Sequence, residues 1–324
     1  MKEIFLHIGA NKTGSTSIQN FLNKNLDWLR RNGVLYPQFG IHDNAHYELS
    51  ESLGFGPKLS SKKRFSLNKL RKIIENSEEE KVVLSSEYFM LSGNFEELKQ
   101  LLKGFRVKVV VYFRRHDLWF ESLYNQAVKT ALNPPWEKGA QSYLDYQLNR
   151  GKQKFDYLES VREWAEHFGE DSIVVRPFEK SQFYNKDLIS DFLKILGVDP
   201  EGRPHGEGQN LNASLSVRVL DFVDSVNRQK GISIPHKAAA VHAVAEVTKN
   251  DKKRFALSPE QRLALIQRFE PSYAEIAKRF LGREDGRLFY EPLPDVDEEW
   301  REPEKATLAQ AMGLFASLAK RYGP

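Results

Sequence analysis

The chain contains 324 residues with a formal net charge of +4, and 40% of its residues are hydrophobic, which is enough for a sizeable core in one or two domains. It has no cysteine, so disulfides, thiolate catalysis and cysteine-based metal sites are excluded. The small positive charge favours anionic ligands only mildly and does not predict a nucleic-acid partner.

Strands and helices alternate through the first part of the chain, a pattern typical of a parallel sheet with helices on both faces. Apolar runs predict strands at 3–8, 81–85, 107–113 and 172–176. Amphipathic runs predict helices at 15–32, 95–103, 117–132, 155–168 and 186–196. A turn-rich segment at 199–208 precedes helices expected at 215–226, 237–247, 259–280 and 305–321. We expect one domain, 1–324, with a P-loop-like α/β core to about residue 200 and a helical extension from about 210.

Three kinds of feature are missing from the sequence. No apolar stretch is long enough to span a bilayer, so no integral membrane segment is expected. The first expected strand begins within three residues of Met1, which leaves no room for a signal peptide, and we expect a cytoplasmic protein. No acidic and histidine residues have the spacing of metal ligands, so no metal is expected. The oligomeric state is not indicated by any pattern in the chain.

Residues 9–16, which read Gly-Ala-Asn-Lys-Thr-Gly-Ser-Thr, join the first expected strand to the first expected helix. A glycine-bearing turn into a helix N-terminus gathers backbone N–H groups at the positive end of the helix dipole, which suits a phosphate-like anion. Lys12 would meet this anion from the loop side. The other polar side chains of the loop are Asn11, Thr13, Ser15 and Thr16. No acidic side chain lies between residues 4 and 26, so nothing nearby is expected to oppose a dianion.

The order of the loop residues separates two classes of phosphate-binding protein. In the ATP and GTP loop, Gly-x-x-x-x-Gly-Lys-Ser/Thr, the lysine follows the second glycine. Here Gly9 and Gly14 have that separation, but Ser15 follows Gly14 and the lysine stands at position 12. An ATP-dependent kinase would also need an acidic residue at a nearby strand end to hold magnesium. A kinase is one alternative function, and a non-catalytic module that binds a nucleotide is another.

A second expected strand ends in cations. The apolar run 109–113 is followed by Arg114 and Arg115 and then by an expected helix. Ligands of open α/β sheets bind beyond the carboxyl ends of the strands. An arginine suits phosphate there because its guanidinium makes paired, charge-assisted bonds. Ser122 lies eight residues after Arg114, about two helical turns along, whereas Arg115 is compatible with a simple cap of the strand.

These two segments resemble the donor-binding motifs of sulfotransferases. Residues 12–16 are similar to the loop that holds the sulfuryl end of 3'-phosphoadenylyl sulfate (PAPS), and the spacing of Arg114 and Ser122 is similar to that of the residues that bind its ribose phosphate. The runs 164–169, 174–179, 192–197 and 210–215 resemble bacterial sulfotransferases in order and spacing. The resemblance implies transfer from PAPS to an acceptor of carbohydrate or glycolipid type. The donor contacts that it implies are Asn11, Lys12, Thr13, Gly14, Ser15, Thr16, Arg114 and Ser122.

Sulfuryl transfer also needs a cation for the leaving oxygen and a base for the acceptor's proton. Lys12 is the expected cation, because negative charge grows on the oxygen between sulfur and phosphorus as that bond breaks. Glu87, just past the expected strand 81–85, is one candidate base, since partial burial makes a carboxylate more basic. His46, in a polar segment after the first helix, is the other, because histidine titrates near neutral pH. We favour Glu87 narrowly.

Two further segments each allow two interpretations. The stretch 58–72 holds seven lysines and arginines and no acidic residue, so it is either a patch that attracts an anionic glycan or an ordinary solvated surface. The aromatic and amide side chains between 136 and 147 either stack against a sugar or form the packing face of a short helix. These side chains are Trp136, Tyr143, Tyr146 and Gln147.

Overall fold

The structure is a computed structural model, and its description covers residues 1–56, 65–149, 155–204, 215–229, 237–238, 241, 255–302 and 307. These residues form two compact units. The described residues of the first unit fall in 1–115, 155–204 and 269–291, and those of the second fall in 116–149, 215–268 and 292–307. The motif at 210–214, most of the expected helix at 237–247 and nearly all of that at 305–321 lie outside the described residues.

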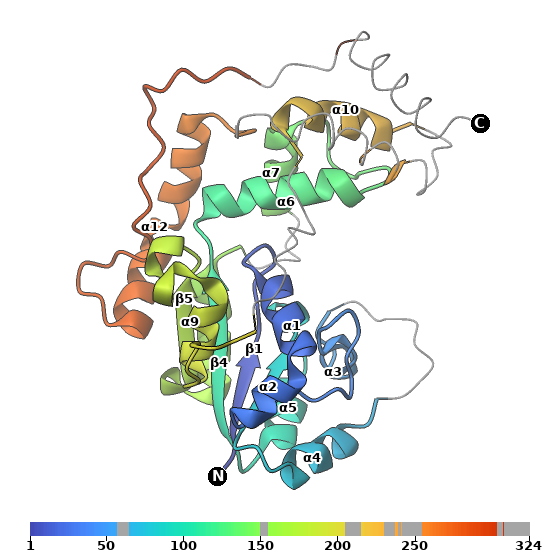
Figure 1. The fold of residues 1–324 in the computed structure, drawn as a ribbon. Coiled ribbons are helices and arrows are strands. Elements are labelled where there is room, and N and C mark those ends of the chain that lie inside the picture. The colour runs from blue at the N-terminus through green and yellow to red at the C-terminus, as the bar shows by residue number, and fades with distance from the viewer. Residues whose placement is uncertain are drawn as a thin grey trace. The chain divides into compact units, whose positions relative to one another are not determined.

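The first unit is built on a five-stranded sheet in which all paired strands are parallel (Figure 1). The strands are β1 (Glu3–His7), β2 (Val34–Leu35), β3 (Lys81–Ser85), β4 (Arg106–Phe113) and β5 (Ile173–Pro177), in the spatial order β2-β3-β1-β4-β5. The central strand β1 pairs Leu6 with Leu84 of β3 on one side and with Val109 of β4 on the other. Their nearly continuous apolar sequences are typical of parallel strands buried on both faces.

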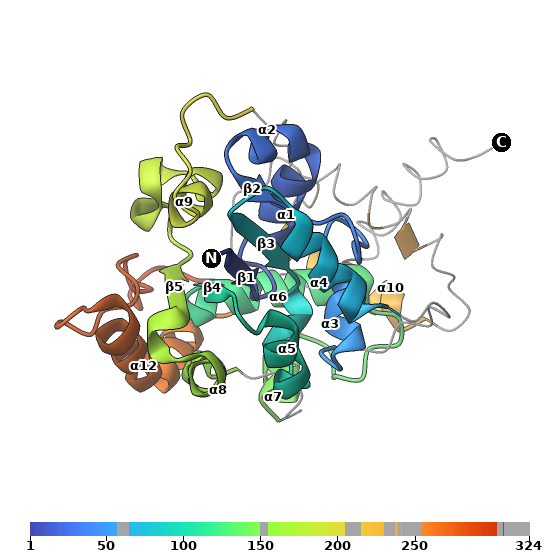
Figure 2. The same ribbon diagram turned by 90° about the horizontal axis from the view of Figure 1, so that it is seen from below.

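Helices cover both faces of this sheet, as Figure 2 shows with the strands viewed from one end. On one face lie α1 (Ser15–Lys24), α2 (Leu26–Arg31) and α9 (Leu188–Ile195), which share a buried apolar cluster with the sheet. On the other face lie α5 (Phe95–Leu102) and α8 (Tyr157–Phe168), where the rings of Phe95 and Trp164 pack 4.8 Å apart. The prediction of an α/β fold with a parallel sheet between two helical layers is therefore confirmed.

The first unit also contains several short elements. They are α3 (Tyr47–Ser52), α4 (Leu67–Asn76) and the 3-10 turns η1 (Glu87–Met90), η2 (Glu170–Ser172), η3 (Lys180–Gln182) and η4 (Tyr184–Lys186). The sequence analysis did not predict α3 or α4. Ser66 begins α4 by accepting a hydrogen bond from the backbone N–H of Lys69, so a segment interpreted as surface or patch contains a capped helix.

The second unit is helical. Its elements are α6 (His116–Thr130), α7 (Ala140–Asn149), α10 (Val217–Asn227) and the first part of α12 (Pro259–Leu281), which continues into the first unit from residue 269. A buried ion pair of 2.7 Å joins Asp117 of α6 to Arg262 of α12. Of the four helices predicted after residue 210, those at 215–226 and 259–280 are confirmed by α10 and α12. The two units do not follow chain order, and the single domain stays a prediction.

One expected helix is interrupted. The prediction of a helix at 15–32 was wrong at Asn25, whose φ of −123° and ψ of 36° separate α1 from α2. The Asn25 side chain donates to the backbone oxygen of Phe21 at 2.7 Å, which is the kind of local bond by which asparagine competes with the helical pattern. The strand β2 was also missed, because two residues are too few to show a periodicity.

Candidate active site

The carboxyl ends of three neighbouring strands bring together the residues that the sequence singled out. β1 ends at His7 before the loop 9–16, β3 ends at Ser85 before Glu87, and β4 ends at Phe113 before Arg114. Because β3, β1 and β4 are adjacent and parallel, these ends share one edge of the sheet. This edge is where an open α/β sheet binds its ligand.

The loop between β1 and α1 has an unusual backbone. Gly9, Lys12 and Gly14 all have positive φ, at 38°, 67° and 80°. Thr13 is buried and its Oγ1 donates to the backbone oxygen of Ala10 at 2.6 Å, which closes the turn. Gly14 precedes α1, no side chain caps the helix, and its first turn carries no acidic residue. The positive end of the α1 dipole therefore opens into this loop.

Gly14 is required by space as well as by conformation. A Cβ at this position would lie 2.3 Å from Cδ2 of Leu188 and 2.9 Å from Cε2 of Phe178. Both distances are well inside van der Waals contact. Side chains near α9 and β5 thus pack directly against the backbone that starts α1, and the loop conformation depends on this close approach.

Two cations lie beside each other at this edge. Arg114 extends one guanidinium nitrogen toward the backbone oxygen of Lys12, at 3.4 Å, and its guanidinium lies 5.6 Å from the ring centre of Phe178. Burial lowers the pKa of Lys12, the charge of Arg114 lowers it further, and Glu87 acts in the opposite sense. An anion placed at the loop would relieve the repulsion between these two cations.

Glu87 brings a carboxylate to the loop. Its two oxygens accept hydrogen bonds from different elements: Oε1 from the hydroxyl of Ser15 in α1, and Oε2 from the hydroxyl of Tyr47 in α3. A Cβ on Gly9 would lie 3.3 Å from the Glu87 side chain, which shows how closely the two segments pack. The expectation that no acidic group lies near the loop was therefore wrong, because η1, which follows β3, supplies Glu87 from 72 residues beyond Ser15.

His46 has a different environment from the one that a catalytic base needs. It is fully buried, its Nδ1 accepts from the backbone N–H of Ser85 at 3.1 Å, and its Nε2 lies 3.0 Å from the backbone oxygen of Pro37, to which it donates. Burial lowers its pKa to about 4. Both ring nitrogens are thus engaged with the backbone, and His46 joins the segment before α3 to the end of β3.

The remaining predicted residues lie in varied places. Asn11 and Thr16 are exposed on the loop and the first turn of α1. Arg115 is buried and donates to the backbone oxygen of Glu291 at 2.8 Å, which fits its interpretation as a structural residue. Ser122 lies on α6 in the second unit, so its role as a partner of Arg114 stays a prediction.

Two residues of the site escaped the sequence analysis. Tyr47 stands at the start of a helix that has no clear periodicity, so nothing in its surroundings pointed to Glu87. His7, the last residue of β1, is buried under the loop, and its Nδ1 lies 2.8 Å from Oγ of Ser85. Burial lowers the pKa of His7 to about 4. A polar residue at the end of an apolar strand was the available signal for His7.

The structure describes part of each of the two segments that allowed two interpretations, the basic stretch 58–72 and the aromatic and amide side chains between 136 and 147. Trp136, Tyr143 and Gln147 are each at least 90% buried, and Tyr143 packs against Phe120 of α6. Tyr143 and Gln147 therefore lie on the packing face of α7, and Trp136, which precedes that helix, packs 4.8 Å from Tyr143. Tyr146 is half-buried, with its ring 5.8 Å from that of Trp136. Residues 57–64 of the basic stretch lie outside the described residues. Among the rest of that stretch, Arg71 donates to the backbone oxygen of Leu101 at 2.7 Å.

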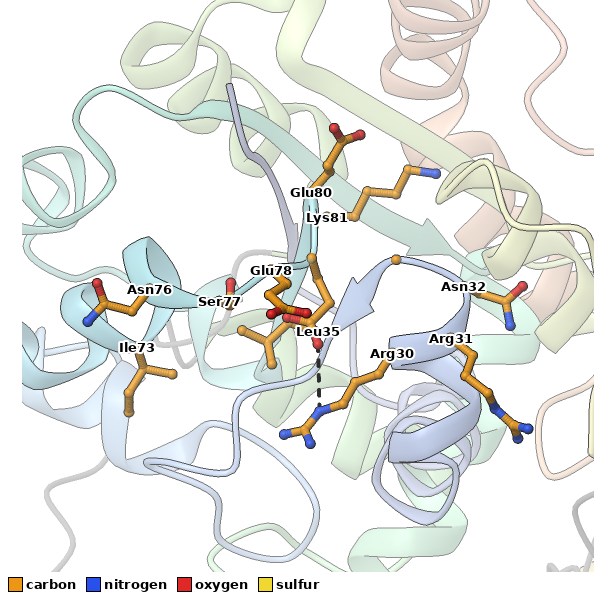
Figure 3. Close-up of a pocket in the computed structure, with 12 residues that line it drawn as sticks. Arg30, Arg31, Asn32, Leu35, Ile73, Asn76, Ser77, Glu78, Glu80 and Lys81 are labelled. Carbon is orange, nitrogen blue, oxygen red and sulfur yellow. Dashed lines mark ion pairs between the residues drawn. The ribbon is translucent and has the colours of Figure 1, made fainter.

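A hollow of about 860 Å³ lies away from the loop, at the amino-terminal side of β2 and β3 (Figure 3). It is open to solvent and has an ion pair of 3.7 Å between Arg30 and Glu79. A second hollow, of about 750 Å³, lies within the second unit between residues of α6, α7, α10 and α12.

Within the described ranges no three His, Asp or Glu side chains gather as metal ligands. No helix in the described part of the chain is long and apolar enough to cross a membrane.

No protein-family model matches the sequence. An uncharacterized protein of Archaeoglobus fulgidus is 30% identical over 209 residues, which are 62% of this chain and 54% of that protein, so the chain spans about half the length of this relative. This similarity does not show a family.

Two solved structures are similar to this chain at low scores. One is a sulfotransferase from Alicyclobacillus acidocaldarius, with a TM-score of 0.41 and 14% identity over 75% of this chain and 96% of that one. The other is mouse sulfotransferase SULT7A1 complexed with PAP, with a TM-score of 0.37 and 14% identity over 78% of this chain and 85% of that one.

Proposed function

We propose that this chain is a sulfotransferase, which moves the sulfuryl group of PAPS to a hydroxyl or amine of an acceptor and releases adenosine bisphosphate. The observation that carries the proposal is the position of Lys12 and Arg114, next to each other at the uncapped N-terminus of α1, with Glu87 held at the same loop. Two cations and a helix dipole suit a multiply charged anion, and the nearby carboxylate supplies a group that can take a proton.

The two cations have different roles in this proposal. Lys12 lies within the loop, so its ammonium can approach the oxygen that bridges sulfur and phosphorus, where charge develops as the bond breaks. Arg114 stands at the end of β4 and binds a phosphate of the donor, as the motif that it shares with sulfotransferases implies, together with Ser122. The polar groups of 11–16 and the N–H groups of α1 surround the phosphosulfate.

Of the two candidate bases, we propose Glu87. It lies at the loop edge and is only partly buried, whereas both nitrogens of His46 are engaged with the backbone in a fully buried position. We propose a carbohydrate or glycolipid acceptor on the resemblance alone. The alternative of an ATP-dependent kinase is less well supported, because the lysine stands inside the loop and not after Gly14.

Two assays test the function. In calorimetry, adenosine bisphosphate should bind equally well with magnesium and with a chelator, and ATP should bind more weakly; magnesium-dependent binding that prefers ATP would support the kinase instead. In the second assay, PAPS labelled in its sulfuryl group is incubated with a panel of glycans and glycolipids. Movement of the label to an acceptor supports the proposal. Tight binding of the bisphosphate without any transfer or turnover of the label would indicate a non-catalytic binding module.

A further inference from the structure

Glu87 is held by two hydroxyl groups that belong to different parts of the first unit. Ser15 lies in the first turn of α1, at the loop that we propose for the donor. Tyr47 lies at the start of α3, outside the loop. Each hydroxyl has one proton to donate, and in the structure both are donated to the carboxylate.

The two hydroxyls would behave differently when a donor binds. In the proposed function the Ser15 hydroxyl, in the first turn of α1, would contact phosphate or sulfuryl oxygens of the donor, and these oxygens would compete with Glu87 for its single proton. The Tyr47 hydroxyl lies in α3, outside the loop, so in this proposal the donor's oxygens do not compete for its proton. Burial and the charge of Glu87 raise the pKa of Tyr47, so that it keeps its proton and remains a donor. Tyr47 is therefore the partner that stays on Glu87.

Tyr47 is itself held firmly against the end of β3. The preceding residue, His46, donates its backbone N–H to the backbone oxygen of Ser85 at 2.7 Å and accepts the N–H of Ser85 on its ring. One turn further along α3, the hydroxyls of Ser50 and Ser86 lie 2.9 Å apart. These contacts tie the segment that carries Tyr47 to the segment that carries Glu87, which gives the buried His46 a structural purpose.

We infer that Tyr47 is a positioning residue for the base: it holds Oε2 of Glu87 so that Oε1 faces the acceptor when the donor has drawn Ser15 away. This inference rests on the proposed function. In the reaction, the acceptor oxygen forms a bond to sulfur, the bond between sulfur and the bridging oxygen breaks, and its electron pair leaves on the phosphate of adenosine bisphosphate. The acceptor's proton moves to Oε1 of Glu87, while the Tyr47 hydroxyl keeps its bond to Oε2.

The variant Tyr47→Phe tests this role, and Tyr88→Phe is its matched control. The ring of Tyr88 packs 4.5 Å from that of Tyr47, so both variants remove one hydroxyl from the same pair of rings, but only Tyr47 donates to Glu87. Among the ionisable groups near Glu87, Lys12 of the loop, Tyr47 of α3 and Tyr88 of η1 interact with its charge. Loss of a donor to a carboxylate disfavours its charged form.

We expect Tyr47→Phe to lower kcat/KM about tenfold or more at the optimum and to move the acid limb of the pH profile to higher pH. Its affinity for adenosine bisphosphate should stay within about twofold of the wild type, and Tyr88→Phe should match the wild type in the pH profile. Glu87→Gln should lose the acid limb. Thermal unfolding of each variant shows whether the first unit remains folded.

The outcomes separate this inference from the function on which it rests. If the wild type transfers the label and Tyr47→Phe has an unchanged pH profile, the positioning role is wrong and the sulfotransferase proposal survives. The same conclusion follows if Tyr47→Phe and Tyr88→Phe shift the profile equally. If the wild type transfers no label to any acceptor while it binds the bisphosphate, the proposed function itself has failed.

Discussion

Replacement of Gly14 by alanine should damage the loop in two ways that can be measured separately. At a φ of 80° any residue other than glycine is strained, which costs about 1–2 kcal/mol. The new Cβ would also lie 2.3 Å from Leu188 and 2.9 Å from Phe178, and overpacking of this kind costs about 1–3 kcal/mol. Together the two effects predict a loss of about 2–5 kcal/mol in the free energy of unfolding.

Gly33→Ala is the matched control in the same unit. Gly33 has a φ of 72°, so alanine there meets the same backbone strain, but no atom lies within 4 Å of the added Cβ. In urea unfolding, Gly33→Ala should therefore lose less free energy of unfolding than Gly14→Ala, and the difference should be about 1–3 kcal/mol, because the overpacking is absent. In calorimetry, Gly14→Ala should bind adenosine bisphosphate at least about tenfold more weakly, because a loss of about 1.4 kcal/mol in binding free energy gives this factor. Gly33→Ala should bind it as tightly as the wild type.

Equal losses of stability in the two variants would refute the reasoning, because they would mean that Leu188 and Phe178 do not press on the start of α1. Unchanged binding by a destabilised Gly14→Ala would also count against the account. The loop geometry would then be irrelevant to the anion, and the link between this close approach and the donor site would be lost.

Two further perturbations test the charges of the first unit. Arg114→Ala should weaken binding of adenosine bisphosphate about tenfold or more, because it removes a charge-assisted contact; Arg30→Ala, at the far hollow of Figure 3, is the control, and equal effects of the two would argue for unspecific attraction. Burial lowers the pKa of His7 from 6.5 to about 4, so the unfolded chain takes up a proton before the folded one and stability should fall by about 3 kcal/mol between pH 6.5 and 4. His7→Phe should flatten this dependence in urea unfolding at several pH values, and an unchanged slope would show that His7 is not buried in its neutral form.

The sheet and the loop were accessible from the sequence because their signals are local. The apolar runs of β1, β3 and β4 are continuous, as parallel strands buried on both faces require, and the loop follows directly from β1. β3 was predicted with its observed bounds, and β1, β4 and β5 were predicted to within one residue at either end. Once these strands are adjacent, the clustering of Lys12, Glu87 and Arg114 follows from the sheet.

The parts that were missed depend on contacts between distant residues. The burial of His46 and its two hydrogen bonds with the backbone of Ser85 arise from tertiary packing, and no pattern around position 46 reveals that pairing. The bond between Tyr47 and Glu87 joins residues 40 positions apart, through a helix too short to predict. The grouping of α6 and α7 with α10 in a second unit is likewise a property of packing and not of composition.

The most direct test of the central claim is the kinetics of Lys12→Ala, with Lys24→Ala at the exposed end of α1 as control. If the ammonium of residue 12 stabilises the departing oxygen, kcat for sulfuryl transfer should fall by roughly a hundredfold to a thousandfold, which is a rise of about 2.7–4 kcal/mol in the barrier, while the control is normal. A normal kcat with only a raised KM for PAPS would show that Lys12 binds the donor without assisting its reaction, and the proposed mechanism would be contradicted.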